Sequence, residues 1–179
     1  YNVPKQKVVK KRNIILISKL HEKRKKLVID MNENNYNASE IVANLYSETS
    51  HFIYELLQNA EDSEATTIEF NLQDDYLSII HNGKLFNYDD VNSITTIGFS
   101  TKKDDLNKIG KFGAGCKSAF AITNTPQIHS GNLHFEIIDY IVPNIIDKIE
   151  LEENYTNIIL PFNLETIDRL KIYNIISDK

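Results

Sequence analysis

The sequence predicts an α/β domain in which amphipathic helices pack on antiparallel strands. Residues 66–72 and 76–80 alternate apolar and polar side chains on either side of a short polar turn, which predicts a two-stranded hairpin. Residues 133–141 and 156–162 read as further strands, and residues 164–176 as a closing helix. Before the hairpin, one stripe of apolar side chains has the spacing of a helix facing a core: Phe52, Ile53, Leu56, Leu57 and Ala60.

Length and composition favour one domain. The chain has 179 residues, of which 41% are hydrophobic, enough for one good core. It has no apolar run of about 18 residues and no signal-peptide pattern, so we expect a soluble, cytoplasmic protein without membrane contact. A single cysteine excludes an internal disulfide.

Charge is distributed unevenly along the chain. Residues 1–30 carry ten Lys and Arg against two acids, a net charge of +8, which leaves -13 on the remainder. Residues 1–36 are therefore expected to form a basic helical arm, and residues 37–179 a second unit. The arm could grip nucleic acid, or its lysines could be the solvated face of a helix that packs through its isoleucines. We favour the second interpretation, because no aromatic residues alternate with the lysines.

Three features between residues 37 and 108 bear on a site. Asn37 and Glu40 have the spacing of a capping box, which predicts the start of a helix. Glu55, Asn59 and Asp62 fall at i, i+4 and i+7, so they line one polar helix face. Residues 81–108 are polar and irregular, which suits a mobile loop or lid.

Residues 109–120, IGKFGAGCKSAF, indicate an anion cradle of an uncommon type. Gly110 and Gly115 have the separation of a Walker A loop, but Cys116 stands where that loop needs its lysine. A dinucleotide-binding fingerprint fails too, because its glycines come in a different order. Glycines that admit a close backbone approach, followed by helix N-terminal amides near Cys116, would still suit an anion.

These motifs resemble those of the GHKL ATPases, and most closely the sacsin-type ATPase domains. The similarity covers roughly residues 45–162 and consists of ELLQNAED, HNG with a following Phe, GFSTK, IGKFGAGCKS and the PQIHSG segment. It implies the Bergerat fold, a two-layer α/β sandwich (α+β) with a mixed, mostly antiparallel sheet and helices on one face. ATP would lie between the helix of Glu55, the Gly83 turn and the lid, in a domain of a longer multidomain protein.

The resemblance also implies roles for individual residues. Glu55 matches the general base that polarises the attacking water, and Asn59 matches the Mg²⁺ ligand. Asp62 would orient water or the metal shell, and Thr156 would contact the base or its water. The phosphates would be held by the glycine loop and lid, namely by Ser100, Lys102, Gly110, Lys111, Phe112, Gly113, Ala114, Gly115, Cys116 and Lys117.

The turn after the second strand departs from the family pattern. Many GHKL proteins have an aspartate there that accepts a hydrogen bond from the adenine amino group, whereas this chain has His81, Asn82 and Gly83. Asn82 could accept from the amino group, neutral His81 could accept through a ring nitrogen, or a water could bridge. We expect reduced base selectivity, with similar affinity for ATP and GTP.

The implied function is Mg²⁺-dependent ATP binding and slow hydrolysis that drives a conformational switch in a chaperone-like or defence-type multidomain protein. Relatives borrow a lysine or arginine from a following domain or partner, and this chain ends soon after Thr156, so we expect weak turnover in isolation. An ATP-dependent dimer would fit the resemblance. The alternative is a nucleotide-sensing module that gates an effector or a nucleic-acid contact without significant hydrolysis. Histidine kinase activity is disfavoured, because the residues after His21 and Glu22 do not continue that pattern.

Overall fold

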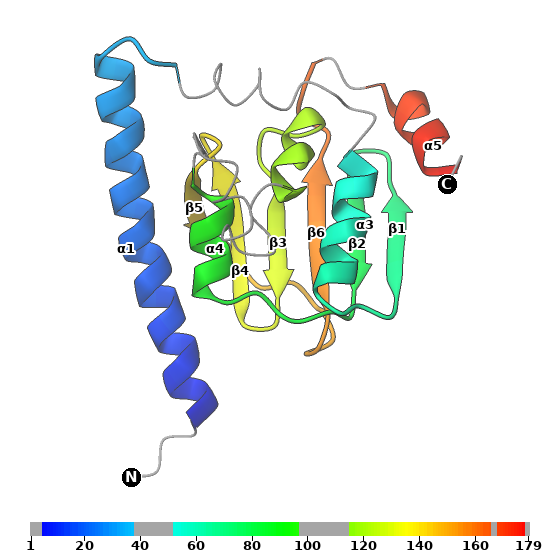
Figure 1. Cartoon of the computed structure of the whole chain (residues 1–179), viewed down its shortest axis with the longest axis horizontal. Coiled ribbons are helices and arrows are strands. Elements are labelled where there is room, and N and C mark those ends of the chain that lie inside the picture. Colours follow the sequence, from blue (N-terminus) through cyan, green and yellow to red (C-terminus); the bar gives the residue numbers. More distant parts are fainter. Residues whose placement is uncertain (1–4, 38–51, 97–114, 166–167, 178–179) are drawn as a thin grey trace.

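The domain is built on an open sheet of six strands, seen face-on in Figure 1. The computed structural model describes residues 5–37, 52–96, 115–165 and 168–177. The strands lie in the order β1-β2-β6-β3-β4-β5, and each of the five pairings among them is antiparallel. A mixed sheet was expected, but the described strands pair antiparallel throughout. Strand β6 lies between the β1–β2 pair and the β3–β4 pair and runs antiparallel to both of its neighbours, β2 and β3. The strands are β1 (Ile68–Leu72), β2 (Tyr76–His81), β3 (Gln127–Ser130), β4 (Leu133–Ile138), β5 (Val142–Ile145) and β6 (Thr156–Pro161).

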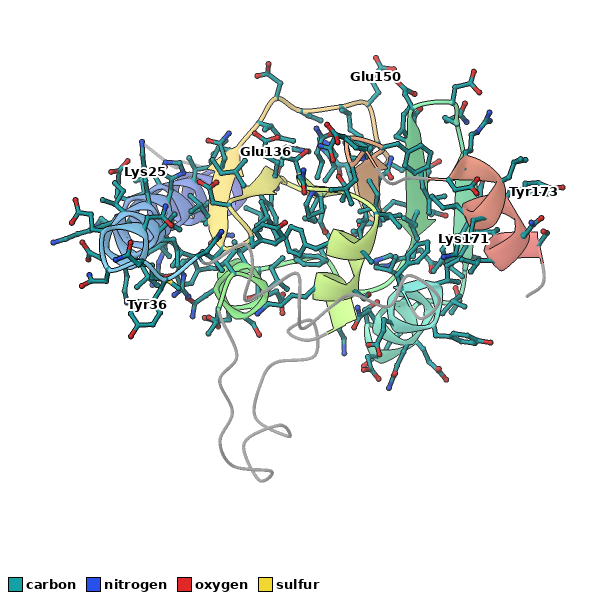
Figure 2. All side chains as sticks on the ribbon, turned by 90° about the horizontal axis from the view of Figure 1, so that it is seen from above. Lys25, Tyr36, Glu136, Glu150, Lys171 and Tyr173 are labelled. Atoms are coloured by element: carbon teal, nitrogen blue, oxygen red, sulfur yellow. The ribbon has the colours of Figure 1, made fainter. Side chains whose placement is uncertain are left out.

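Helices form a second layer on one face of this sheet. Figure 2 shows α3, α4 and η1 on the same side, while the connection that carries Glu150 crosses the opposite side. At the far edge, Arg169 of α5 forms a 2.7 Å ion pair with Asp74 in the β1–β2 turn. The predicted two-layer α/β arrangement is therefore present. The helices are α1 (Lys5–Glu33), α3 (Phe52–Asp62), α4 (Tyr88–Ile94), the 3₁₀ helix η1 (Gly115–Ala121) and α5 (Arg169–Ser177).

One hydrophobic core fills the space between the helix layer and the sheet. Side chains of β2 alternate so that Leu77 and Ile79 point into this core, and the apolar stripe of α3 covers them. The predicted stripe is thus confirmed for Phe52, Ile53, Leu56 and Ala60, all buried, while Leu57 is half-buried.

Helix α1 lies along β5 and contributes to the same core. Ile17 and Leu20 are buried, whereas Lys19, Lys23 and Lys26 are exposed. This is the packed arrangement that the sequence favoured for the basic arm. Within the described part of the chain, no helix combines the length and hydropathy that a membrane crossing requires.

Three local predictions differ from the structure. The run 133–141 is not one strand, because Asp139 and Tyr140 adopt positive φ angles of 49° and 64° and turn the chain into β5. Part of the region expected to be irregular forms α4, whose N-terminus is closed by a capping box between Asn87 and Asp90. Strand β3 was not predicted. The capping box expected at Asn37 and Glu40 and the helix after it fall in residues 38–51, outside the described residues.

Polar side chains are buried on the sheet face that lies away from the helices. Ser78 donates a 2.8 Å hydrogen bond to Asn157, and the Nδ1 atoms of His129 and His134 lie 3.2 Å apart on adjacent strands. Burial disfavours the charged form of His129, and the electrostatic effect of His134 acts in the same direction, so the pKa of His129 falls to about 4. The His129 ring is therefore neutral at physiological pH.

Candidate functional site

Helix α3 carries the predicted polar face. The apolar stripe beside this face is buried, which fixes the rotation of the helix on the sheet. As a result Glu55 is half-buried and Asp62, at the C-terminal end of the helix, is exposed. Asn59 is 6% exposed, so a neutral amide is held at the inner side of the helix. Helix α3 also packs against η1, which follows the glycine-rich loop.

The end of α3 is locked to the turn after β2. Ser63 follows α3, and its carbonyl oxygen accepts a 2.7 Å hydrogen bond from the Lys84 N–H. A Cβ atom on Gly83 would overlap Ser63 Oγ and lie 2.9 Å from Ser63 Cβ. The predicted turn therefore needs glycine at position 83, because the backbone passes directly against Ser63.

His81 is the last residue of β2, and its side chain lies on the core side of the sheet. The ring is 2% exposed, and its Nδ1 atom accepts a 3.2 Å hydrogen bond from the Gly83 N–H. Burial lowers the pKa of His81, so the ring is neutral. A neutral ring that accepts at Nδ1 carries its hydrogen on Nε2.

Asn82 faces away from the core and holds a neighbouring loop. Its Oδ1 atom accepts from the N–H groups of Thr66 and Thr67, at 2.9 and 3.0 Å, and its amide donates to Thr66 Oγ1. The side chain thereby closes the connection between α3 and β1. Both lone pairs of its carbonyl oxygen are engaged within the protein.

Thr156 lies in a row of buried polar side chains at one end of the sheet. It pairs across the strands with His81 on one side and Ser130 on the other, so the three side chains share the helix-facing surface. Thr156 is fully buried, and its Oγ1 lies 2.6 Å from Ser130 Oγ, which also accepts from the Phe86 N–H. His81 ends β2, Ser130 ends β3 and Thr156 begins β6, and Figure 1 shows β2, β6 and β3 side by side in the sheet.

Ser130 was not singled out from the sequence, although it stands in the PQIHSG segment. The sequence feature that could have identified it is its position directly before Gly131, at the end of a strand. Gly131 has a φ of 56°, which turns the chain directly after Ser130.

Lys117 is buried beside a second cation. Its ammonium group donates to the carbonyl oxygen of Thr96, just after α4, and the side chain is 5% exposed. From α1, Arg24 donates to Thr96 Oγ1 at 2.8 Å and to Asn92 Oδ1 at 3.2 Å. Burial, together with the charge of Arg24, lowers the pKa of Lys117 to about 8.

Several predicted phosphate contacts fall outside the described residues. These are Ser100, Lys102, Gly110, Lys111, Phe112, Gly113 and Ala114. Gly115 and Cys116 begin η1, and only their backbone is described.

The chain matches a known protein family over most of its length. The family model described as "Sacsin domain" matches residues 36–160, which include α3, strands β1 to β5 and all of β6 except its last residue, Pro161. This chain belongs to the sacsin-domain family. The resemblance to sacsin-type domains inferred from the motifs is therefore confirmed at the level of the family.

Parts of three longer proteins are similar to this chain. The chain is 36% identical to Protein NO VEIN of Arabidopsis thaliana over 119 residues, which is 60% of this chain and 4% of that protein. It is 33% identical to human Sacsin over 104 residues, 49% of this chain and 2% of that protein. It is 31% identical to the "Putative type II restriction enzyme HgiDII" of Herpetosiphon aurantiacus over 93 residues, 48% of this chain and 15% of the relative. This chain thus matches only a small part of the length of each of these relatives.

Arg24 lies outside the residues that the family model matches, yet it reaches the sacsin domain at Thr96. Sequence reasoning did not distinguish it from the nine other cations of the basic arm. Its contacts depend on how α1 packs against α4, which no local pattern reveals.

Proposed function

We propose that this sacsin domain binds ATP with Mg²⁺ and hydrolyses it slowly, and that this cycle drives a conformational switch in a larger chaperone-like or defence-type protein. The observation that carries the proposal is the junction between α3 and the sheet. Through Ser63 and Gly83, the helix of Glu55 and Asn59 is fixed against the buried row of His81, Thr156 and Ser130. Polar groups buried on an otherwise apolar face suit a ligand with both a ring and charged groups.

The GHKL relationship is part of this proposal. The two-layer architecture with helices on one face supports it, as does the order of the motifs along the chain. A buried neutral amide such as Asn59 suits Mg²⁺ that also binds phosphate oxygens, because the nucleotide supplies the negative charge. Mg²⁺ would neutralise developing charge on the phosphates, while Glu55 would hold and polarise the attacking water.

Titration calorimetry of ATP into the 179-residue chain, with and without Mg²⁺, tests the binding step. We expect Mg²⁺-dependent binding that is lost in Asn59→Ala and retained in Gln58→Ala, a matched amide on the exposed side of the same helix. Equal binding by both variants would remove Asn59 from the site. Turnover by the chain alone should be weak, and brisk hydrolysis would contradict the need for a cation from another domain or partner.

The alternative is a nucleotide sensor that gates an attached effector without significant hydrolysis. A Glu55→Ala variant of the longer protein separates the two functions. An ATPase motor should lose its activity while still binding nucleotide, whereas a sensor should keep signalling.

A further inference from the structure

We propose that His81 makes this site prefer purine nucleotides with a carbonyl oxygen at ring position six, such as inosine and guanosine nucleotides, over adenosine nucleotides. The inference rests on the proposed function, because it takes the buried row of His81, Thr156 and Ser130 as the surface that meets the base. It goes beyond reduced selectivity, since it predicts the direction of the preference.

The hydrogen bond between Gly83 and His81 determines which polar group the ring offers. The Gly83 N–H occupies the lone pair of Nδ1, so the lone pair that could accept from an adenine amino group is already used. Burial keeps the ring neutral, which leaves the second nitrogen, Nε2, as an N–H donor. Within the described residues, this N–H donates to no neighbouring group.

Among the described residues, Asn82, Thr156 and Ser130 do not restore an acceptor in place of the usual carboxylate. Asn82 uses its carbonyl oxygen for the N–H groups of Thr66 and Thr67. The hydroxyl groups of Thr156 and Ser130 can either donate or accept, so they do not discriminate between an amino group and a carbonyl oxygen. Discrimination at position six therefore depends on His81.

A donor that faces a donor leaves two N–H groups without an acceptor, whereas a carbonyl oxygen would accept from Nε2. Unpaired buried polar groups typically weaken binding by about tenfold to a hundredfold. We expect a preference of this size for a 6-oxo purine.

Calorimetric titration of ATP, ITP and GTP with Mg²⁺ into the 179-residue chain tests the inference. ITP differs from ATP in the base around position six, so it isolates that part of the ring. We expect ITP and GTP to bind at least about tenfold more tightly than ATP. In His81→Asp, whose carboxylate is an acceptor, the order should reverse. His21→Asp on α1 makes the same change away from the row and should leave the order unchanged.

The outcomes separate this inference from the proposed function. ATP binding as tightly as ITP, or more tightly, would overturn the preference and leave nucleotide binding intact, for example through a shifted base whose N1 atom accepts from Nε2. No binding by any of the three nucleotides would overturn both proposals. The ranking on the unaltered chain decides the matter even where His81→Asp, checked by circular dichroism, does not fold.

Discussion

The Lys117 ammonium group donates a hydrogen bond to the carbonyl oxygen of Thr96, which joins the beginning of η1 to the end of α4. Arg24 binds the same residue through its hydroxyl group, so two cations converge on one threonine. These contacts place a buried ammonium group where its charge is unfavourable.

Lys117→Met should change how stability depends on pH. The pKa of Lys117 is about 8 in the folded chain, against 10.5 for an ordinary lysine, so between these values the unfolded chain binds more protons. The free energy of unfolding of the original chain should therefore rise with pH relative to Lys117→Met, by at most about 3 kcal/mol. Urea denaturation of both proteins at pH 7 and pH 10 measures this difference. Lys84→Met, an exposed control that keeps Lys117, should show the same rise as the original chain, and parallel curves for the original chain and Lys117→Met would contradict the expectation.

Gly83→Ala should destabilise the domain, because the new Cβ atom would overlap Ser63 Oγ. Relief requires the turn or the end of α3 to shift, at a cost of about 1–3 kcal/mol. Adding Ser63→Gly removes the side chain that clashes, so the double variant should recover part of the loss relative to Ser63→Gly alone. Denaturant midpoints of the four proteins measure the coupling, and strictly additive effects would exclude the contact as the cause.

His129 should make the domain sensitive to acid. Its pKa is about 4 in the folded chain and 6.5 ordinarily, so between pH 6.5 and pH 4 protons bind preferentially to the unfolded chain. The free energy of unfolding should fall over this range as pH decreases, by at most about 3 kcal/mol from this group. His129→Gln should lose less stability over the same range. Urea denaturation at several pH values measures the free energy of unfolding of both proteins. If it depends on pH identically in the two, groups other than His129 cause the acid sensitivity.

Glu55→Ala tests the proposed hydrolysis. A general base typically contributes about a hundredfold to ten-thousandfold in rate, so the rate of phosphate release should fall by at least a hundredfold. Nucleotide affinity should stay within a few-fold, because the carboxylate acts on water rather than on the bound phosphates. Gln58→Ala should retain both properties. Unchanged turnover in Glu55→Ala would remove this residue from the chemistry.

Local patterns in the sequence predicted the parts of the fold that depend on neighbouring residues. The stripe that includes Phe52 and Leu56 defines α3, and the alternation around residues 66–80 defines the first hairpin, because burial on one face repeats with the period of the element. Short elements such as β3 and α4 contain too few repeats for this signal. The turn at Asp139 was missed because apolar residues continue on both sides of it.

Contacts between distant segments could not be predicted in the same way. The motifs indicated Glu55, Asn59 and Thr156, but the partner of Thr156 depends on the register of β3 against β6. The role of Asn82 in holding the loop at Thr66 depends on where α3 ends relative to β2. Such contacts follow from the packed arrangement of whole elements rather than from spacing along the chain.

Helix α1 also has a consequence for the integrity of the sheet. It runs along β5, the last strand in the order, and His21 donates a 3.0 Å hydrogen bond to the carbonyl oxygen of Pro143 on that strand. Uncovered edge strands can recruit strands from other molecules, and proteins commonly protect them with proline or with a covering helix. A chain trimmed to the family-matched residues 36–160 would lose this helix. We therefore expect the β5 edge of the trimmed chain to be open to pairing with strands of other molecules.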